Sequence, residues 1–294
     1  MKVVNPLLER CFQLIEFLAE EPRAFRLGVI SEKLGLQKGA VHRLLTALCG
    51  MGWVEQEPET GFYRLTLRLA IMGQRVLIGT RIPDVTRPIL QKLAEESQEL
   101  VRMAILEGDR SLSWVVYVQG RRTGLIYQPE MIGRVPLTVT SHGKAWLSTL
   151  PREEAMRIVR EEGFPEPGRF GPRAIQSIDA FAAALDETRA RGWGMSYEEG
   201  DRGIAAIAAA IRPSGPNTPA VATCSVAGPL MRFGAEDIVR NASLVMAAAN
   251  EIAAIWPLRS LQTQTDLAAA RQLRDDGRVA SPIAYANSSY IDQR

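Results

Sequence analysis

Apolar residues in the N-terminal part of the chain recur at steps of three and four positions. This spacing places them on one face of a helix, and it predicts helices over residues 6–20, 28–34 and 38–49. Gly35 separates the second helix from the third, because glycine accepts the left-handed conformation that ends a helix. Two short helices joined across a tight glycine turn are typical of a helix-turn-helix.

The pattern changes to alternation after the third helix. Residues 53–56 and 62–65 are expected to be strands, joined by a turn that contains proline and glycine. A hairpin directly after a helix-turn-helix is a wing. Residues 1–66 are therefore predicted to form a winged helix-turn-helix domain.

A linker helix is expected over residues 67–82. Leu69, Met72 and Val76 lie on one face of this helix, spaced to meet a partner. That face is the candidate contact between two copies of the chain.

A second domain is predicted over residues 83–258, where strand-like and helix-like segments alternate. Helices are expected over 84–97, 141–149, 151–162, 177–191 and 235–256, and strands at 101–105, 111–119, 124–128, 204–211 and 219–226. This alternation indicates an α/β or α+β domain with a central sheet. Residues 259–294 are polar and weakly patterned, so we expect a loosely ordered tail.

Charge and cysteine content change this picture little. The formal net charge of +2 lies entirely in residues 1–80, which hold 10 Lys and Arg against 8 Glu. This small excess permits DNA binding without arguing for it. The three cysteines form no CxxC pair, which argues against a disulfide framework or a zinc site and suits a reducing cytosol. With no secretory signal and no membrane span recognised, a cytoplasmic protein without metal or cofactor is expected.

The helix over residues 38–49 carries the sharpest candidate site. Its apolar stripe turns inward, so the residues between the stripe positions face outward. We expect DNA contacts from Gln37, Lys38, Ala40, His42 and Arg43, and from Arg64 on the wing. Arg43 suits a bidentate contact with guanine, and Ala40 suits a thymine methyl group. On pattern alone, these residues also fit the solvated face of an ordinary helical hairpin.

Several stretches, taken in order, resemble one protein family. Leu36–Leu45, followed by Gly52–Val54 and Gly61–Leu65, resembles the DNA-binding domain of the IclR family of transcription regulators. Pro136–Ala145 and the stretch from Arg191 to Pro229 resemble the effector domain of that family. The resemblance extends from residue 6 to about residue 257.

The resemblance implies a GAF-like second domain that binds a small, often carboxylate-bearing effector. It also implies dimers or tetramers at palindromic operators in double-stranded DNA. The pocket positions carried over are Gly124, Tyr127, Ser141, His142, Gly143, Ser196, Ala206, Ser225 and Ala227. The free N–H groups of the turn over 141–143, which opens a helix, are expected to hold the carboxylate.

Departures from the family pattern bear on both sites. Gly39 and Ala40 stand where the family often has two hydroxyl residues, so phosphate anchoring there is weaker or comes from elsewhere. Ala206 and Ala227 stand at positions that are often polar, while Tyr127 adds an aromatic wall. We therefore expect a larger or more apolar effector, such as an aromatic acid. Plain packing roles for Tyr127 and His142 remain open.

Two other classes of protein are weaker alternatives. A hydrolase would have to use Ser141 and His142, or Cys224, yet the chain has only two histidines and no GxSxG elbow. The acidic run at Glu198, Glu199 and Asp201 lacks a histidine or a second cluster to complete a metal site. The winged helix could also serve protein contacts alone. We expect a regulator and not an enzyme.

Overall fold

The computed structural model describes residues 5–20, 23–108, 110–121, 123–129 and 131–256. The chain divides into two compact units, Met1–Pro83 and Asp84–Arg294, and each is described by itself. The tail expected over residues 259–294 lies outside the described residues.

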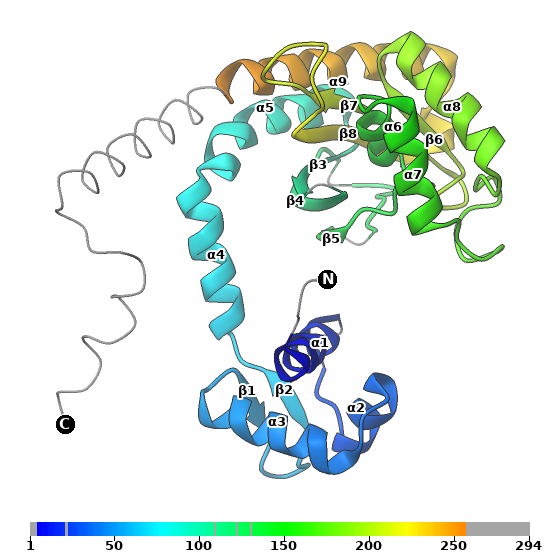
Figure 1. Ribbon diagram of the computed structural model, residues 1–294. Coiled ribbons are helices and arrows are strands. Elements are labelled where there is room, and N and C mark those ends of the chain that lie inside the picture. The colour runs from blue at the N-terminus through cyan, green and yellow to red at the C-terminus, as the bar shows by residue number, and fades with distance from the viewer. Residues whose placement is uncertain (1–4, 21–22, 109, 122, 130, 257–294) are drawn as a thin grey trace, which may run out of the picture. The chain divides into compact units, whose positions relative to one another are not determined.

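The first unit contains the helix-turn-helix that the sequence predicts (Figure 1). Its helices are α1 (Pro6–Glu20), α2 (Leu27–Leu34) and α3 (Lys38–Gly50). Gly35 ends α2 in the left-handed conformation, with φ of 62°, as expected. The hydroxyl of Ser31 donates to the carbonyl of Leu36 at 2.5 Å, which fixes the turn before α3. The stripe residues Leu14, Ile30, Val41 and Leu45 are fully buried and form the core.

The wing follows α3 as two short antiparallel strands, β1 (Val54–Gln56) and β2 (Tyr63–Leu65). Glu55 lies directly opposite Arg64 in this pair. Phe25 forms an isolated bridge to Tyr63 on the other side of β2. The predicted winged helix-turn-helix is therefore confirmed.

Helix α4 (Arg68–Thr80) has no buried residue within the described part of its unit. Its exposed apolar side chains are Ile71, Met72, Val76 and Ile78. Leu67, just before the helix, is exposed as well. Arg81 adopts φ of 55° and ends α4, and α5 (Ile82–Ser97) begins at the next residue. The predicted start at residue 84 was wrong, because Pro83 is tolerated in the first helical turn, where its missing N–H has no intrahelical partner.

The second unit is built on a six-stranded sheet in the order β5-β4-β3-β8-β7-β6. The strands are β3 (Leu100–Glu107), β4 (Ser111–Gln119), β5 (Gly133–Arg134), β6 (Gly194–Tyr197), β7 (Ile204–Ile211) and β8 (Ala222–Pro229). Every neighbouring pair is antiparallel, so the domain is α+β and not a parallel α/β sheet. The strand expected over 124–128 is wrong, since the described residues 123–129 are irregular and Gly124 has φ of 79°.

Helices cover both faces of this sheet, and β8 shows which face each covers. Cys224 donates its thiol to the carbonyl of Val245 on α9 (Ala235–Ile255), at 3.7 Å. The adjacent Thr223 contacts His142 on α6 (Ser141–Leu147). Successive strand residues point to opposite faces, so α9 and α6 lie on opposite sides of the sheet.

Helix α9 is the one helix in the described part of the chain that is long and apolar enough to cross a membrane by length and composition. In the structure, 33% of that apolar stretch is buried. Its buried residues include Ala242, Val245 and Ile252, which cover the sheet. The buried apolar residues of α9 thus belong to the core of the second unit.

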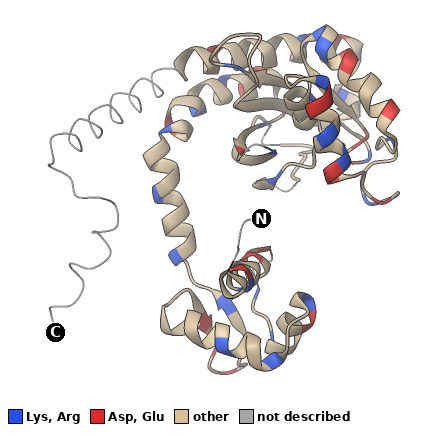
Figure 2. Cartoon of the chain, viewed as in Figure 1, with Lys and Arg blue, Asp and Glu red and all other residues tan. Residues whose placement is uncertain are grey.

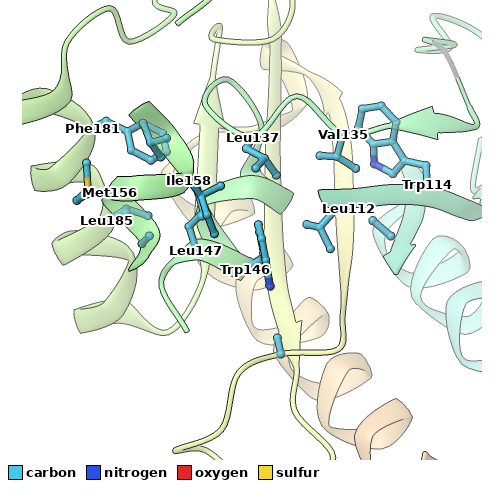
Figure 3. Packing of buried hydrophobic residues seen from close by; sticks show 14 residues of the cluster. Leu112, Trp114, Val135, Leu137, Trp146, Leu147, Met156, Ile158, Phe181 and Leu185 are labelled. Atoms are coloured by element: carbon cyan, nitrogen blue, oxygen red, sulfur yellow. The ribbon is translucent and has the colours of Figure 1, made fainter. Parts of the chain in front are cut away.

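A second apolar cluster joins the sheet to α6, α7 (Arg152–Glu162) and α8 (Ile178–Arg191). Figure 3 shows it running from Phe181 and Leu185 on α8 to Trp114 on β4. Helix α6 packs so closely that a Cβ atom on Gly143 would lie 2.0 Å from the Leu137 carbonyl oxygen. A side chain at residue 143 would therefore push α6 off this cluster.

Candidate effector site and nucleic-acid interface

A cavity of about 400 Å³ lies in the second unit, on the α6 side of the sheet. Six of the nine positions carried over by resemblance line it: Tyr127, Ser141, His142, Ser196, Ala206 and Ala227. Gly124, Gly143 and Ser225 do not line it. Most of the expected pocket is thus brought together, although its members come from distant parts of the chain.

Small side chains on three adjacent strands leave the space for the cavity. Ala206 on β7 lies opposite Ser196 on β6 and opposite Ala227 on β8, so the three form one row across the sheet. The hydroxyl of Ser196 donates to the Val139 carbonyl at 2.9 Å and is therefore engaged within the protein. The side of the cavity formed by these three strands thus consists mostly of methyl groups.

Arg102 is one of the cavity-lining residues that the sequence interpretation missed. It lies in the middle of β3 and is only 7% exposed. Its guanidinium carbon lies 4.1 Å from the centroid of the Trp114 ring, and both residues line the cavity. A buried guanidinium beside a cavity favours a carboxylate, which it can bind with two parallel hydrogen bonds.

His142 lies in the first turn of α6 and is 1% exposed. Its Nδ1 is 2.7 Å from Oγ1 of Thr223, and its ring meets the Trp114 ring edge-on at 6.0 Å between centroids. Burial, and then the charge of Arg102, hold the pKa of His142 well below 6.5. The ring is therefore neutral at neutral pH and acts as a hydrogen-bonding group, not as a cation.

Tyr127 and Asp201 join two loops that border the cavity. The Tyr127 hydroxyl donates to the Asp201 carboxylate, and both residues line the cavity. Burial and this hydrogen bond raise the pKa of Tyr127 well above its usual value. The contact thus holds the two loops together beside the cavity.

The turn at the start of α6 offers less to an anion than expected. Gly143 donates its N–H to Oγ1 of Thr140 at 3.1 Å, so this amide is not free for a carboxylate. Ser225 is buried opposite Arg102 on the neighbouring strand, and its Oγ has no hydrogen-bond partner among the described residues. Gly124 lies in the loop that leads to Tyr127.

The outer face of α3 is the candidate nucleic-acid interface. Gln37, Lys38, His42 and Arg43 are exposed, and Ala40 is half-buried. No acidic residue occurs in α3 or α4, and Figure 2 shows basic positions on α3, on the wing and along α4. Gln37 precedes α3, and its side chain makes no capping hydrogen bond to the helix.

Arg64 on the wing is exposed but paired. Its Nε donates to the Glu55 carboxylate at 2.6 Å, across the two strands of the wing. An exposed ion pair of this kind contributes little to stability, so a phosphate can displace Glu55. The wing therefore presents an exposed basic group that is paired with Glu55.

Both units match models of one family. The model described as "Bacterial transcriptional regulator IclR C-terminal" matches residues 74–254, more than half of the chain. The model described as "IclR helix-turn-helix domain" matches residues 7–58. The chain belongs to the IclR family of bacterial transcriptional regulators.

Curated relatives of this IclR-family chain are regulators by name. The "Transcriptional repressor IclR" of Escherichia coli is 27% identical over 246 residues, covering 83% of this chain and 88% of the relative. The "Glycerol operon regulatory protein" of Streptomyces griseus is 30% identical over 226 residues, covering 77% and 85%.

Solved structures share the fold. An IclR regulator from Alicyclobacillus acidocaldarius has a TM-score of 0.73 at 19% identity, covering 85% of this chain and 98% of that one. An IclR homologue from Microbacterium hydrocarbonoxydans, solved with 4-hydroxybenzoate, has a TM-score of 0.66 at 22% identity, covering 84% and 97%.

Two of the residues considered for catalysis or metal binding, His142 and Glu198, contact other groups in this IclR-family chain. His142 turns Nδ1 to Thr223. Glu198 accepts from the N–H of Gly203 at 3.0 Å and lies 3.6 Å from Arg173. Within the described residues, no group of three His, Cys, Asp or Glu side chains is placed to hold a metal.

Proposed function

We propose that this IclR-family protein binds a palindromic operator through α3 and the wing, and that a carboxylate effector in the cavity changes its DNA affinity. The observation that carries the effector class is Arg102, a buried cation that lines the cavity. A carboxylate beside Arg102 would form charge-assisted hydrogen bonds with the guanidinium. The remaining lining favours a hydrophobic body on the effector.

We infer an aromatic acid from the size and walls of the cavity. Trp114, Tyr127 and Phe170 line a volume of about 400 Å³, with room for a substituted benzene ring. The Microbacterium homologue, whose structure contains 4-hydroxybenzoate, supports this class. Very small acids would leave much of the apolar wall uncovered.

We propose a homodimer as the DNA-binding form, and a cytoplasmic location beside the chromosome. Ile71, Met72 and Val76 of α4 are each about half exposed or more, and a second copy would bury them. A two-fold dimer presents two copies of α3 to two half-sites, which is the reason for expecting a palindromic operator.

A mobility-shift experiment with separate variants tests both halves of the proposal. The probe is DNA upstream of the protein's own gene, with benzoate, 4-hydroxybenzoate and aliphatic acids as candidate effectors. We expect Arg43→Ala to weaken the shift, and Arg102→Gln to keep the shift but lose the response to acid. A matched surface change, Arg240→Ala, alters net charge equally and should do neither. An acid response that survives in Arg102→Gln would refute the proposed role of Arg102.

A further inference from the structure

Two buried ring nitrogens at the cavity have no hydrogen-bond partner among the described residues. They are Nε1 of Trp114 on β4 and Nε2 of His142 on α6. The two residues are 5% and 1% exposed, and both line the cavity. Their rings meet edge-on, and Arg102 covers the face of the indole. Buried polar groups are nearly always paired, so these two nitrogens lack the polar partner that such groups normally have.

Thr223 determines whether Nε2 of His142 can donate a hydrogen bond to such a partner. A neutral imidazole carries one proton, on Nδ1 or on Nε2, and the partner of one nitrogen fixes the state of the other. The Thr223 hydroxyl lies 2.7 Å from Nδ1 and can donate to it. When the hydroxyl donates, the ring proton resides on Nε2, and that N–H becomes a donor.

We propose that His142, fixed as the Nε2–H tautomer by Thr223, is a specificity-determining residue that donates to an effector carboxylate beside Arg102. The indole N–H of Trp114 donates to the same group. The inference rests on the proposed function, and it adds that these residues recognise the carboxylate group of the effector. Thr223 does not line the cavity, so it acts as a positioning residue through His142.

The donor set predicts which ligands are refused. Arg102, Trp114 and the Nε2–H tautomer of His142 present N–H groups and no acceptor. A carboxylate accepts through both oxygens and satisfies these donors. A carboxamide of the same shape turns an NH2 group toward them, which leaves donors facing each other. Benzoate should therefore bind and benzamide should not.

Matched variants at residue 223 separate the hydroxyl from the shape of the side chain. Thr223→Val keeps the volume and removes the donor, whereas Thr223→Ser keeps the donor. By calorimetry with benzoate, we expect Thr223→Val to weaken binding by roughly tenfold, and Thr223→Ser to weaken it far less. Thermal unfolding of both variants checks that they are folded.

A spectroscopic measurement reads the tautomer directly and does not depend on a folded variant at residue 223. The chain has only two histidines, so ¹⁵N-histidine labelling of the full-length His42→Gln protein reports on His142 alone. We expect the ¹⁵N pattern of the Nε2–H tautomer, and a shift of Nε2 when benzoate is added.

The outcomes separate this inference from the proposed function. An Nδ1–H tautomer, equal benzoate binding by Thr223→Val and wild type, or binding of benzamide as tight as benzoate would each overturn the role of His142. The proposed function would survive these results if an acid still changed DNA affinity. If the wild type bound no acid at all, both would be overturned.

Discussion

Lys144 places its Nζ 2.5 Å from both carboxylate oxygens of Glu199, and both side chains are buried. The same ammonium donates to the Met195 carbonyl at 2.9 Å. The contact joins α6, which carries Ser141 and His142, to the loop that carries Asp201. Burial lowers the pKa of Lys144 and raises that of Glu199, while their attraction opposes both changes. Two sides of the cavity are thus held together by one ion pair.

Removing one partner of this pair should be far worse than removing both charges. We expect Lys144→Met to lower the free energy of unfolding by about 3–5 kcal/mol, because it leaves Glu199 buried without a counter-charge. The double variant Lys144→Met with Glu199→Gln should recover most of that loss. Urea unfolding measures all three proteins, and a double variant no more stable than Lys144→Met would contradict the explanation.

Arg43 is expected to read a base in the major groove. Arg43→Ala should weaken binding to the specific site by about 1–3 kcal/mol and relax the preference at one base pair. Lys38→Ala should instead weaken binding to all DNA and reduce its salt dependence, as the loss of a phosphate contact does. Anisotropy titrations on the operator and on single-base variants distinguish these effects. Unchanged base preference in Arg43→Ala would exclude the proposed contact.

We expect Glu55 to compete with DNA for Arg64. Glu55→Gln removes the carboxylate that holds the Arg64 guanidinium and should raise DNA affinity severalfold at low salt. The double-mutant cycle with Arg64→Ala supplies the control, because Glu55→Gln should gain much less when Arg64 is absent. A gain of the same size in both backgrounds would mean that Arg64 does not contact DNA.

The stability of the second unit should fall in mild acid because of His142. Its pKa in the folded protein lies well below 6.5, owing to burial and to Arg102. Below pH 6.5 the unfolded chain therefore binds a proton that the folded chain does not, so the free energy of unfolding decreases as pH falls. The slope is at most about 1.4 kcal/mol per pH unit from this one group.

Two histidine variants isolate that effect. His142→Asn should flatten the loss of stability between about pH 6.5 and about pH 5, whereas His42→Asn, on the exposed face of α3, should keep it. Urea midpoints measured across this range provide the comparison. The same acid slope in wild type and His142→Asn would show that other groups cause it.

The local sequence pattern was sufficient to predict the elements whose conformation depends on residues close together in the chain. The stripe through Val41 and Leu45 gave α3, and Gly35 gave the turn before it, because helical period and left-handed backbone are properties of short segments. The hairpin from Val54 to Leu65 followed from alternation and turn residues in the same way. The start of α5 was predicted wrongly because the steric effect of Pro83 depends on its position within the helical turn.

The cavity could be predicted only in part, because its geometry depends on strand pairing between distant segments. Ser225 and Ala227 lie on the same face of β8, yet Ala227 alone lines the cavity, and the resemblance does not distinguish the two. Arg102 did carry a local signal, because it is the one charged residue among the apolar residues from Leu100 to Leu106 of β3. Its role in the cavity could not be predicted, because that role depends on contact with Trp114. The position of Trp114 beside Arg102 depends on a register shift between β3 and β4.

The central claim is that a ligand in the cavity of the second unit sets the DNA affinity of the first. Fluorescence anisotropy with labelled DNA from upstream of the protein's own gene tests it most directly, at two salt concentrations, with and without benzoate or 4-hydroxybenzoate. We predict specific binding that weakens steeply with salt and changes severalfold with an aromatic acid. Specific binding that no carboxylate alters, or equal binding to unrelated DNA, would contradict the claim.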